Sequence, residues 1–185
     1  MTPLDPSVAF VLLAAGRSKR FGSEKLTAVL GGKPLWEWSA QAAEDAGFQN
    51  RFLVVGEHSS VGSRVGWNRV LNPDADRGMG SSIAAGVGAA SGHERVVIAL
   101  ADMPFIDVRH LRMLGEGRGA VFTRQADGGA GTPAAFDRAS FAQLSSLAGD
   151  KGARSLHIHG ARLVEPSSER MLLDIDRPAD LPEER

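Results

Sequence analysis

A short apolar run that ends in a basic, glycine-containing loop constrains this chain more than any other stretch. Residues 10–13 are wholly apolar, which is typical of a strand buried on both faces of a sheet. Three small residues follow, Ala14, Ala15 and Gly16, and then four cations, Arg17, Lys19, Arg20 and Lys25. Small residues let a ligand lie against the main chain, and a glycine tolerates a positive φ. Because exposed amides beside cations form a site for an anion, the loop predicts a polyphosphate ligand.

The spacing excludes two familiar phosphate-binding loops. Five residues separate Gly16 from Gly22, and no Lys-Ser or Lys-Thr pair follows Gly22, so the loop is not a P-loop. The sequence Gly16-Arg17-Ser18 lacks the second glycine of the dinucleotide-binding fingerprint. A strand followed by a basic loop with glycine is common, so composition alone leaves an ordinary surface loop equally open.

Composition narrows the class of protein. A chain of 185 residues suits one domain, which we expect to span residues 1–185. The formal net charge of -1 argues against a general nucleic-acid binder, and the absence of cysteine excludes disulfides and thiolate metal sites. No apolar run approaches the roughly 20 residues that span a bilayer, and residues 1–7 lack the basic start of a secretory signal. We therefore expect a cytoplasmic protein that binds neither nucleic acid nor membrane.

Strand-like and helix-like segments alternate along the chain. Strands are predicted at residues 10–13, 51–55, 70–71, 96–100, 120–123, 134–136 and 162–164. Helices are predicted at residues 34–46, 107–114, 140–147 and 152–158, from Ser81 or Ser82 to Ala90, and as a turn from Pro178 onward. This alternation predicts an α/β fold, with a mostly parallel sheet and helices on both faces. Ligands of such sheets bind outside the carboxyl ends of the strands, where the loops after Leu13 and Leu100 should meet.

Asp102 is the first candidate for a metal ligand. It follows the most apolar strand of the chain, so its carboxylate should emerge at the ligand edge of the sheet. A polyphosphate substrate requires Mg²⁺, which takes one or two carboxylates together with phosphate oxygens and water. Asp102 could instead cap a turn or the helix that begins near Asp107.

Two further segments could contact a ligand. In Gly78-Met79-Gly80-Ser81-Ser82, two glycines lead into a helix whose N-terminal amides favour negative charge, although a plain turn with a cap fits equally. Lys151 and Arg154, at the start of another predicted helix, could attract an acceptor phosphate or belong to an ordinary surface helix.

The first loop resembles a known signature. Leu13-Ala14-Ala15-Gly16-x-Ser18-x-Arg20-x-Gly22-x-x-Lys25 is similar to the loop of the nucleotidyltransferases that make molybdenum cofactor dinucleotides. It looks most like the cytidylyltransferase branch, because the guanylyltransferase branch usually reads Leu-Ala-Gly-Gly. The resemblance covers nearly the whole chain and implies a Rossmann-like fold of the nucleotide-diphospho-sugar transferase type. It also implies Mg²⁺, a nucleoside triphosphate (CTP favoured over GTP), a phosphate-bearing acceptor such as molybdopterin, and a partner in molybdoenzyme maturation.

Later segments carry the same resemblance. Residues 100–104 resemble the metal-binding segment of the family, and residues 172–181 resemble its closing motif, in which an acidic or amide side chain reaches the metal. Asp174 and Asp176 point the same way in an extended segment, so both remain candidates, and Asp176 could instead cap a helix. Residues 78–82 are similar to the segment that contacts base and ribose, and residues 149–154 to a segment on the acceptor side. Gly131-Thr132-Pro133 departs from the Gly-His-Pro of many cytidylyltransferases, which bears on the identity of the acceptor.

These observations predict a transfer of a nucleoside monophosphate with release of pyrophosphate. The attacking phosphate is already an anion, so the protein needs positioning and charge neutralisation rather than a general base. We assign the triphosphate to Lys25 and Arg20, with Arg17 as a secondary candidate, and the metal to Asp102 with Asp174 or Asp176. The predicted nucleotide-binding residues are Leu13, Ala14, Ala15, Gly16, Arg17, Gly78, Met79, Gly80, Ser81 and Ser82. Alternative functions are a sugar- or alditol-phosphate nucleotidyltransferase and a non-catalytic nucleotide-binding accessory protein.

Overall fold

A seven-stranded sheet with the strand order β5-β4-β1-β6-β8-β7-β9 forms the centre of the protein. A computed structural model describes residues 1–16, 25–175 and 180. The strands are β1 (Val8–Leu13), β4 (Asn50–Gly56), β5 (Asn68–Asn72), β6 (Arg95–Leu100), β7 (Val121–Arg124), β8 (Ala130–Asp137) and β9 (Arg162–Val164). The pairs β1–β4, β1–β6, β4–β5 and β7–β9 are parallel, whereas β8 is antiparallel to both β6 and β7. The predicted mostly parallel sheet is confirmed.

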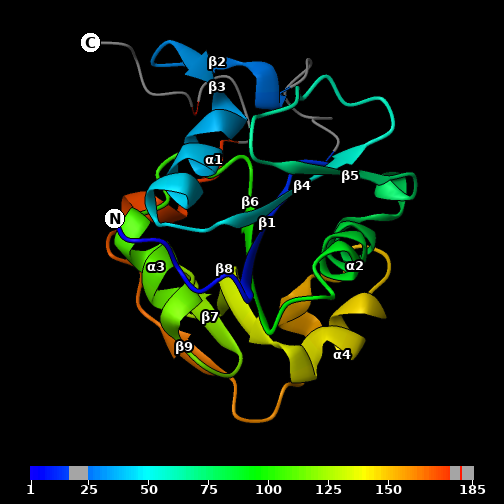
Figure 1. The fold of residues 1–185 in the computed structure, drawn as a ribbon, viewed down its shortest axis with the longest axis vertical. Helices are drawn as coiled ribbons and strands as arrows, with labels where there is room; N and C mark the ends of the chain where they lie inside the picture. Colours follow the sequence, from blue (N-terminus) through cyan, green and yellow to red (C-terminus); the bar gives the residue numbers. More distant parts are fainter. Residues whose placement is uncertain (17–24, 176–179, 181–185) are drawn as a thin grey trace.

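Helices cover both faces of the sheet, as predicted (Figure 1). Helices α1 (Leu35–Asp45) and α3 (Val108–Glu116) lie on one side, and α2 (Met79–Ala89) and α4 (Phe141–Ser145) lie on the other. All six residues of β1 are buried. Phe10 and Leu12 pack in the core on the α1 and α3 side, while Val11 and Leu13 pack in the core on the α2 and α4 side. A strand between two helical layers needs apolar residues on both faces, which explains its unbroken apolar run.

Short elements complete the described chain. The small hairpin of β2 (Val29–Leu30) and β3 (Lys33–Pro34) was not predicted. The short 3₁₀ turns are η1 (Lys25–Thr27), η2 (Ala75–Arg77), η3 (Arg138–Ser140), η4 (Ala153–Ser155) and η5 (Glu169–Leu172). Among the described helices, none has the length and apolar character needed to cross a bilayer.

Two predicted helices differ from the structure. Helix α2 begins at Met79 after Gly78, which has φ of 105°, so the prediction that Ser81 or Ser82 caps this helix was wrong. Both serines lie within the first turn, and the Ser81 hydroxyl donates to the carbonyl of Gly78 at 2.8 Å. The predicted helix at residues 152–158 is only the 3₁₀ turn η4, because the chain is extended again at Leu156. The predicted helical turn from Pro178 lies outside the described residues.

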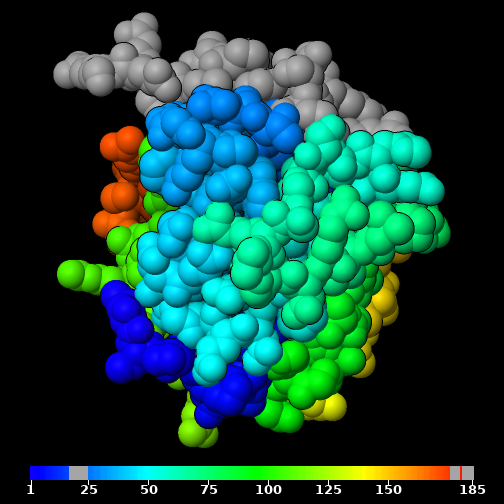
Figure 2. All heavy atoms as spheres, turned by 45° about the horizontal axis from the view of Figure 1, so that its top comes forward, coloured from blue at the N-terminus to red at the C-terminus, as the bar shows by residue number. Residues whose placement is uncertain are grey.

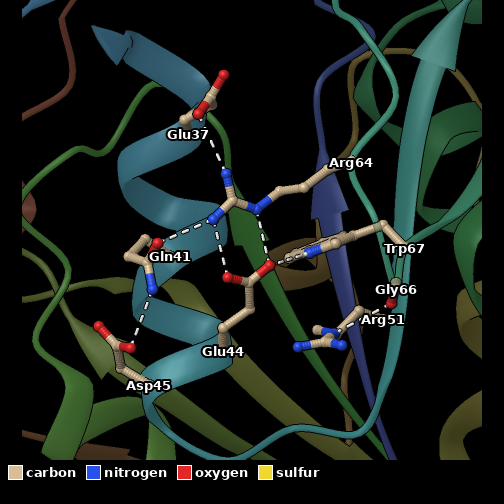
Figure 3. Close-up of polar contacts among 8 residues, drawn as sticks. All are labelled: Glu37, Gln41, Glu44, Asp45, Arg51, Arg64, Gly66 and Trp67. Atoms are coloured by element: carbon tan, nitrogen blue, oxygen red, sulfur yellow. Dashed lines mark hydrogen bonds and ion pairs between the residues drawn. The ribbon is translucent and has the colours of Figure 1, made fainter. Parts of the chain in front are cut away.

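A polar cluster fastens the loop after β4 onto helix α1. We call Arg64, Glu37, Gln41, Glu44 and Trp67 the Arg64 clasp (Figure 3). The Arg64 guanidinium donates to Glu44 at 2.7 and 2.8 Å, to Gln41 at 2.9 Å and to Glu37 at 3.1 Å. The Trp67 indole donates to Glu44 at 2.7 Å. The space-filling view shows the turquoise loop lying against the blue helix α1 (Figure 2), so the clasp joins two surface segments that are distant in sequence.

The clasp should make stability depend on pH through Glu44. The hydrogen bond from Arg64 and that from Trp67 hold the pKa of Glu44 below its ordinary value, although burial opposes this. Because the pKa of Glu44 is lower in the folded protein than in the unfolded chain, its ionised carboxylate stabilises the fold at pH values above the ordinary glutamate pKa. This stabilisation is lost as the pH falls through the lower pKa of the folded protein. We expect Glu44→Gln to cost about 1–2 kcal/mol at neutral pH and progressively less toward about pH 3.

Urea unfolding of both proteins across that pH range measures this difference. The exposed Glu57, which lies in the same loop region, supplies the matched control Glu57→Gln, whose effect should be small at every pH. A stability loss in Glu44→Gln that stays constant with pH would contradict the assignment.

Candidate active site

The loops that leave β1 and β6 lie side by side, as predicted from the sheet rule. Leu13 pairs with Leu100 at the ends of the two strands, and the amide of Ala101 donates to the carbonyl of Leu13 at 3.0 Å. The amide of Ala14 donates to the carbonyl of Val54 at 2.8 Å. Within the described residues, the first loop amide without a hydrogen bond is therefore that of Ala15.

The space beside Gly16 is open. The glycine at position 16 does not have a positive φ, and a methyl group there would meet nothing within 4 Å. The fold itself therefore leaves room beside the main chain at this point.

A cavity of about 540 Å³ opens at this edge of the sheet. Eight predicted site residues line it: Leu13, Ala15, Gly16, Lys25, Gly78, Met79, Ser82 and Asp102. Five residues outside the predicted set also line it: Leu26, Ala75, Asp76, Leu100 and Asp150. Ala14, Gly80 and Ser81 are not part of the lining, and Arg17, Arg20 and Asp176 lie outside the described residues. The structure thus brings together residues from both loops and from the start of α2.

Lys25 and Asp102 form an ion pair at the cavity wall. The Lys25 ammonium donates to Asp102 Oδ2 at 2.6 Å, and the two side chains are 11% and 21% exposed, respectively. The other oxygen of this carboxylate, Oδ1, is buried and has no hydrogen-bond partner among the described residues. Burying an oxygen without a hydrogen-bond partner costs free energy, because the oxygen loses its bonds to water. A bound cation at Asp102 Oδ1 would compensate for this loss.

The segment predicted to supply a second carboxylate lies against Asp102. The amide of Ile175 donates to the carbonyl of Asp102 at 3.1 Å. Ile175 is buried and packs with Leu30 and Leu35, whereas the preceding Asp174 is exposed. The described residues contain no group of three or more His, Cys, Asp or Glu side chains that could enclose a metal. Asp102 with its unpartnered Oδ1 fits a divalent cation that takes most of its remaining ligands from phosphate and water.

The first turn of α2 packs against the loop of residues 148–150. The amide of Gly80 donates to the carbonyl of Gly149 at 2.9 Å, and the amide of Gly78 donates to Ala75 at 3.2 Å. A methyl group at Gly80 would lie 2.8 Å from the backbone of Ala148, so this glycine permits the close approach. The amides of Gly78 and Gly80 therefore both donate within the protein. Met79, the first residue of the helix, offers the amide that helix geometry leaves free.

Hydrogen bonds between serine and asparagine side chains hold this first turn of α2. Asn72, at the end of β5, donates through Nδ2 to the hydroxyls of Ser81 and Ser82, both at 3.0 Å. The pair Asn72 and Ser82 is buried, and Ser82 also lines the cavity. These bonds fix the N-terminus of α2 at the cavity wall.

The start of β8 reaches the same edge from the other side of β6. Ile98 pairs with Ala134 in the antiparallel ladder, so Gly131-Thr132-Pro133 lies in the direction of the carboxyl end of β6. The hydroxyl of Thr132 contacts the sulfur of Met103 at 3.8 Å, next to Asp102. The Gln125 side chain donates through Nε2 to the carbonyl of Thr132 at 3.1 Å and holds the segment in place. The segment of residues 131–133, which differs from the family pattern, therefore contacts the residue that follows Asp102 in sequence.

Comparison with known proteins identifies relatives over most of the chain. Residues 10–163 match the model of the MobA-like NTP transferase domain. The purine catabolism protein PucB of Bacillus subtilis is 31% identical over 193 residues, which cover 95% of this chain and 94% of PucB.

Solved structures share the fold. Rv0371c of Mycobacterium tuberculosis is 28% identical, with a TM-score of 0.80 over 94% of this chain and 95% of that one. A complex of Rv0371C with manganese is 25% identical, with a TM-score of 0.71 and the same coverage. The molybdopterin-guanine dinucleotide biosynthesis protein A of Archaeoglobus fulgidus has a TM-score of 0.66 over 94% of each chain, and its 20% identity supports the fold alone.

Proposed function

Because this chain belongs to the MobA-like NTP transferase family and is a nucleotidyltransferase, we propose that it transfers CMP from CTP to molybdopterin with Mg²⁺. The observation that carries this proposal is the cavity in which Lys25 and Asp102 meet Gly16 and the start of α2. A cation and an under-bonded carboxylate beside a glycine-containing loop suit a triphosphate with its metal.

The proposed chemistry is an in-line displacement. An oxygen of the acceptor phosphate attacks the α-phosphorus of CTP, the bond to the β-phosphate breaks, and pyrophosphate leaves with the electron pair. The acceptor phosphate is ionised, so no side chain has to remove a proton. A bound divalent cation would supply charge neutralisation at the phosphate oxygens, with Asp102 and either Asp174 or Asp176 as its protein ligands.

The roles of the other residues follow from this scheme. Lys25 would bind the triphosphate and neutralise the charge that develops as pyrophosphate departs, and Arg20 and Arg17 would add to it. The amides of Ala15 and Met79 would approach the phosphates or the nucleoside. The acceptor would approach from the side of β8, because Thr132 lies beside Met103 there. The partner in molybdoenzyme maturation stays a prediction from the resemblance.

A matrix of nucleotides and acceptors, read out as pyrophosphate, tests the proposal. The nucleotides are CTP, GTP, ATP and UTP, and the acceptors are molybdopterin, a sugar 1-phosphate and an alditol phosphate. Pyrophosphate with CTP and molybdopterin alone supports the proposal. Pyrophosphate release with a sugar or alditol phosphate would show that the proposed acceptor is wrong and that the proposed reaction class is right.

Base choice is a prediction of its own. Ala15 lines the cavity and is 7% exposed, and its methyl group should disfavour a purine while leaving space for a pyrimidine. A change of one methylene discriminates by about 1–3 kcal/mol, so hydrogen bonds must supply any larger preference. We expect CTP to be used over GTP, and Ala15→Gly to relax this preference without reversing it.

Competition between equal concentrations of CTP and GTP on one acceptor measures the preference directly. Ala14→Gly is the matched control, because Ala14 is buried and is not part of the cavity lining. Equal use of both nucleotides by the wild-type protein, or use of GTP first, would refute the cytidylyl assignment.

A further inference from the structure

Asp150 lines the cavity, although the family resemblance put its segment on the acceptor side. Asp150 lines the cavity together with Gly78 and Met79, on the wall formed by the first turn of α2. A methyl group built on Gly78 would lie 2.5 Å from Asp150 Oδ1, so this oxygen sits directly over the glycine. The preceding Gly149 accepts the amide of Gly80 at 2.9 Å. This backbone contact holds the residue that precedes Asp150 against the first turn of α2.

Asp150 is a hydrogen-bond acceptor with spare capacity. Its side chain is exposed, and within the described residues it takes part in no ion pair or hydrogen bond. An ionised carboxylate accepts hydrogen bonds and donates none. Its charge repels phosphate groups, which the ammonium of Lys25 in the same cavity attracts. Without a bridging cation, such as the one proposed at Asp102, the part of a nucleotide that can lie against Asp150 is the part that carries donors and no charge.

That part is the nucleoside. The ribose hydroxyls and an exocyclic amine are its donors, and both form charge-assisted hydrogen bonds with a carboxylate. Asp150 would thereby orient the nucleotide, because the opposite orientation would bring a carboxylate against the triphosphate. Removal of the carboxylate should weaken nucleotide binding and, at the same time, remove a repulsion from phosphate.

We propose that Asp150 is a specificity-determining residue that accepts a hydrogen bond from the nucleoside half of the nucleoside triphosphate, from a ribose hydroxyl or an exocyclic amine. This inference rests on the proposed function, since it takes a nucleoside triphosphate as the occupant of the cavity. It assigns the wall of Gly78, Met79 and Asp150 to the nucleoside and the wall of Lys25 and Gly16 to the phosphates.

Isothermal titration calorimetry on the full chain with CTP and with inorganic tripolyphosphate tests the proposal. We expect Asp150→Ala to weaken CTP binding by about 10- to 100-fold, and Asp150→Asn to weaken it less, because the amide oxygen still accepts. Tripolyphosphate should bind the Asp150→Ala variant as tightly as the wild type or more tightly. Asp45→Ala, an exposed carboxylate at the far end of α1, is the control and should change neither.

Nucleotide analogues identify the donor. If the ribose provides it, the loss caused by Asp150→Ala should vanish with 2′-deoxy-CTP or with 3′-deoxy-CTP. If the amine provides it, the loss should vanish with UTP. An equal loss of affinity for CTP and tripolyphosphate would mean that Asp150 only supports the fold, and unchanged CTP affinity would likewise overturn the proposal.

The two proposals fail in different ways. A wild-type protein that binds CTP but releases no pyrophosphate with any acceptor would refute the proposed function and leave the role of Asp150 standing. Normal pyrophosphate release with an Asp150→Ala variant that binds CTP like the wild type would refute the role of Asp150 alone.

Discussion

Asp102→Asn is expected to lower pyrophosphate release by about 10³-fold or more and to remove its ordinary dependence on Mg²⁺. The carboxylate stands at the end of β6, and its Oδ1 is buried without a hydrogen-bond partner in the described chain. A carboxamide of the same shape keeps the side chain in place but loses the charge that a divalent cation requires. Initial rates of pyrophosphate release across a Mg²⁺ titration measure both effects.

Stability must be measured beside activity, because the same substitution breaks the ion pair with Lys25. The substitution removes the charge of the carboxylate that the Lys25 ammonium contacts at 2.6 Å in a largely buried position, so Asp102→Asn should also destabilise the fold. The double variant Lys25→Met with Asp102→Asn removes both charges and should recover part of that stability, with activity still absent.

Asp107→Asn is the matched control for Asp102→Asn. Its carboxylate accepts the amide of His110 at 2.9 Å and caps α3, so its replacement should affect only stability and leave the Mg²⁺ titration unchanged. If Asp102→Asn behaved like Asp107→Asn, Asp102 would be a structural residue.

The sheet could be predicted because the sequences of its central strands are unbroken apolar runs. Every residue of β1 is buried between two helical layers, and the five residues Arg95 to Ala99 of β6 are buried too. Strand β8 was predicted only at residues 134–136, although it begins at Ala130. Gly131 and Pro133 near its start are residue types that strands disfavour. Its antiparallel direction depends on pairing with β6 and β7.

The location of the candidate site could be predicted from the sequence, but the contacts between its side chains could not. The sheet rule brought the loops after Leu13 and Leu100 together, and eight predicted residues do line one cavity. The bond between Lys25 and Asp102 spans 77 positions in sequence, and no local pattern encodes it. Asp150 escaped prediction because its position depends on the backbone contact between Gly80 and Gly149.

The start of α2 shows why a local signal can mislead. Serines before an apolar helical pattern are typical N-caps, which favoured Ser81 or Ser82. The structure uses Gly78 at that position, because its positive φ turns the chain directly from η2 into the helix. The serines instead accept hydrogen bonds from Asn72, a buried contact that sequence spacing does not reveal.

Lys25→Ala is expected to lower turnover by about 10²–10³-fold, the usual cost of losing one preorganised donor at a site of developing charge. In the structure the ammonium lies at the cavity wall, within 2.6 Å of Asp102. The departing pyrophosphate gains negative charge in the transition state, so the contribution of a fixed cation is larger there than in the bound substrate. We therefore expect the fold-decrease in kcat of the variant to exceed the fold-increase in its KM for CTP.

Steady-state kinetics with saturating acceptor separates the two constants. Lys33→Ala is the matched control, because this lysine lies over the ring of Trp38 at 3.7 Å and is not part of the cavity lining. Lys25→Arg keeps the charge and should retain more activity than Lys25→Ala. If Lys25→Ala turned over within a few-fold of the wild type, the ammonium would serve only to pair Asp102, and the first loop would lose its assignment to the triphosphate.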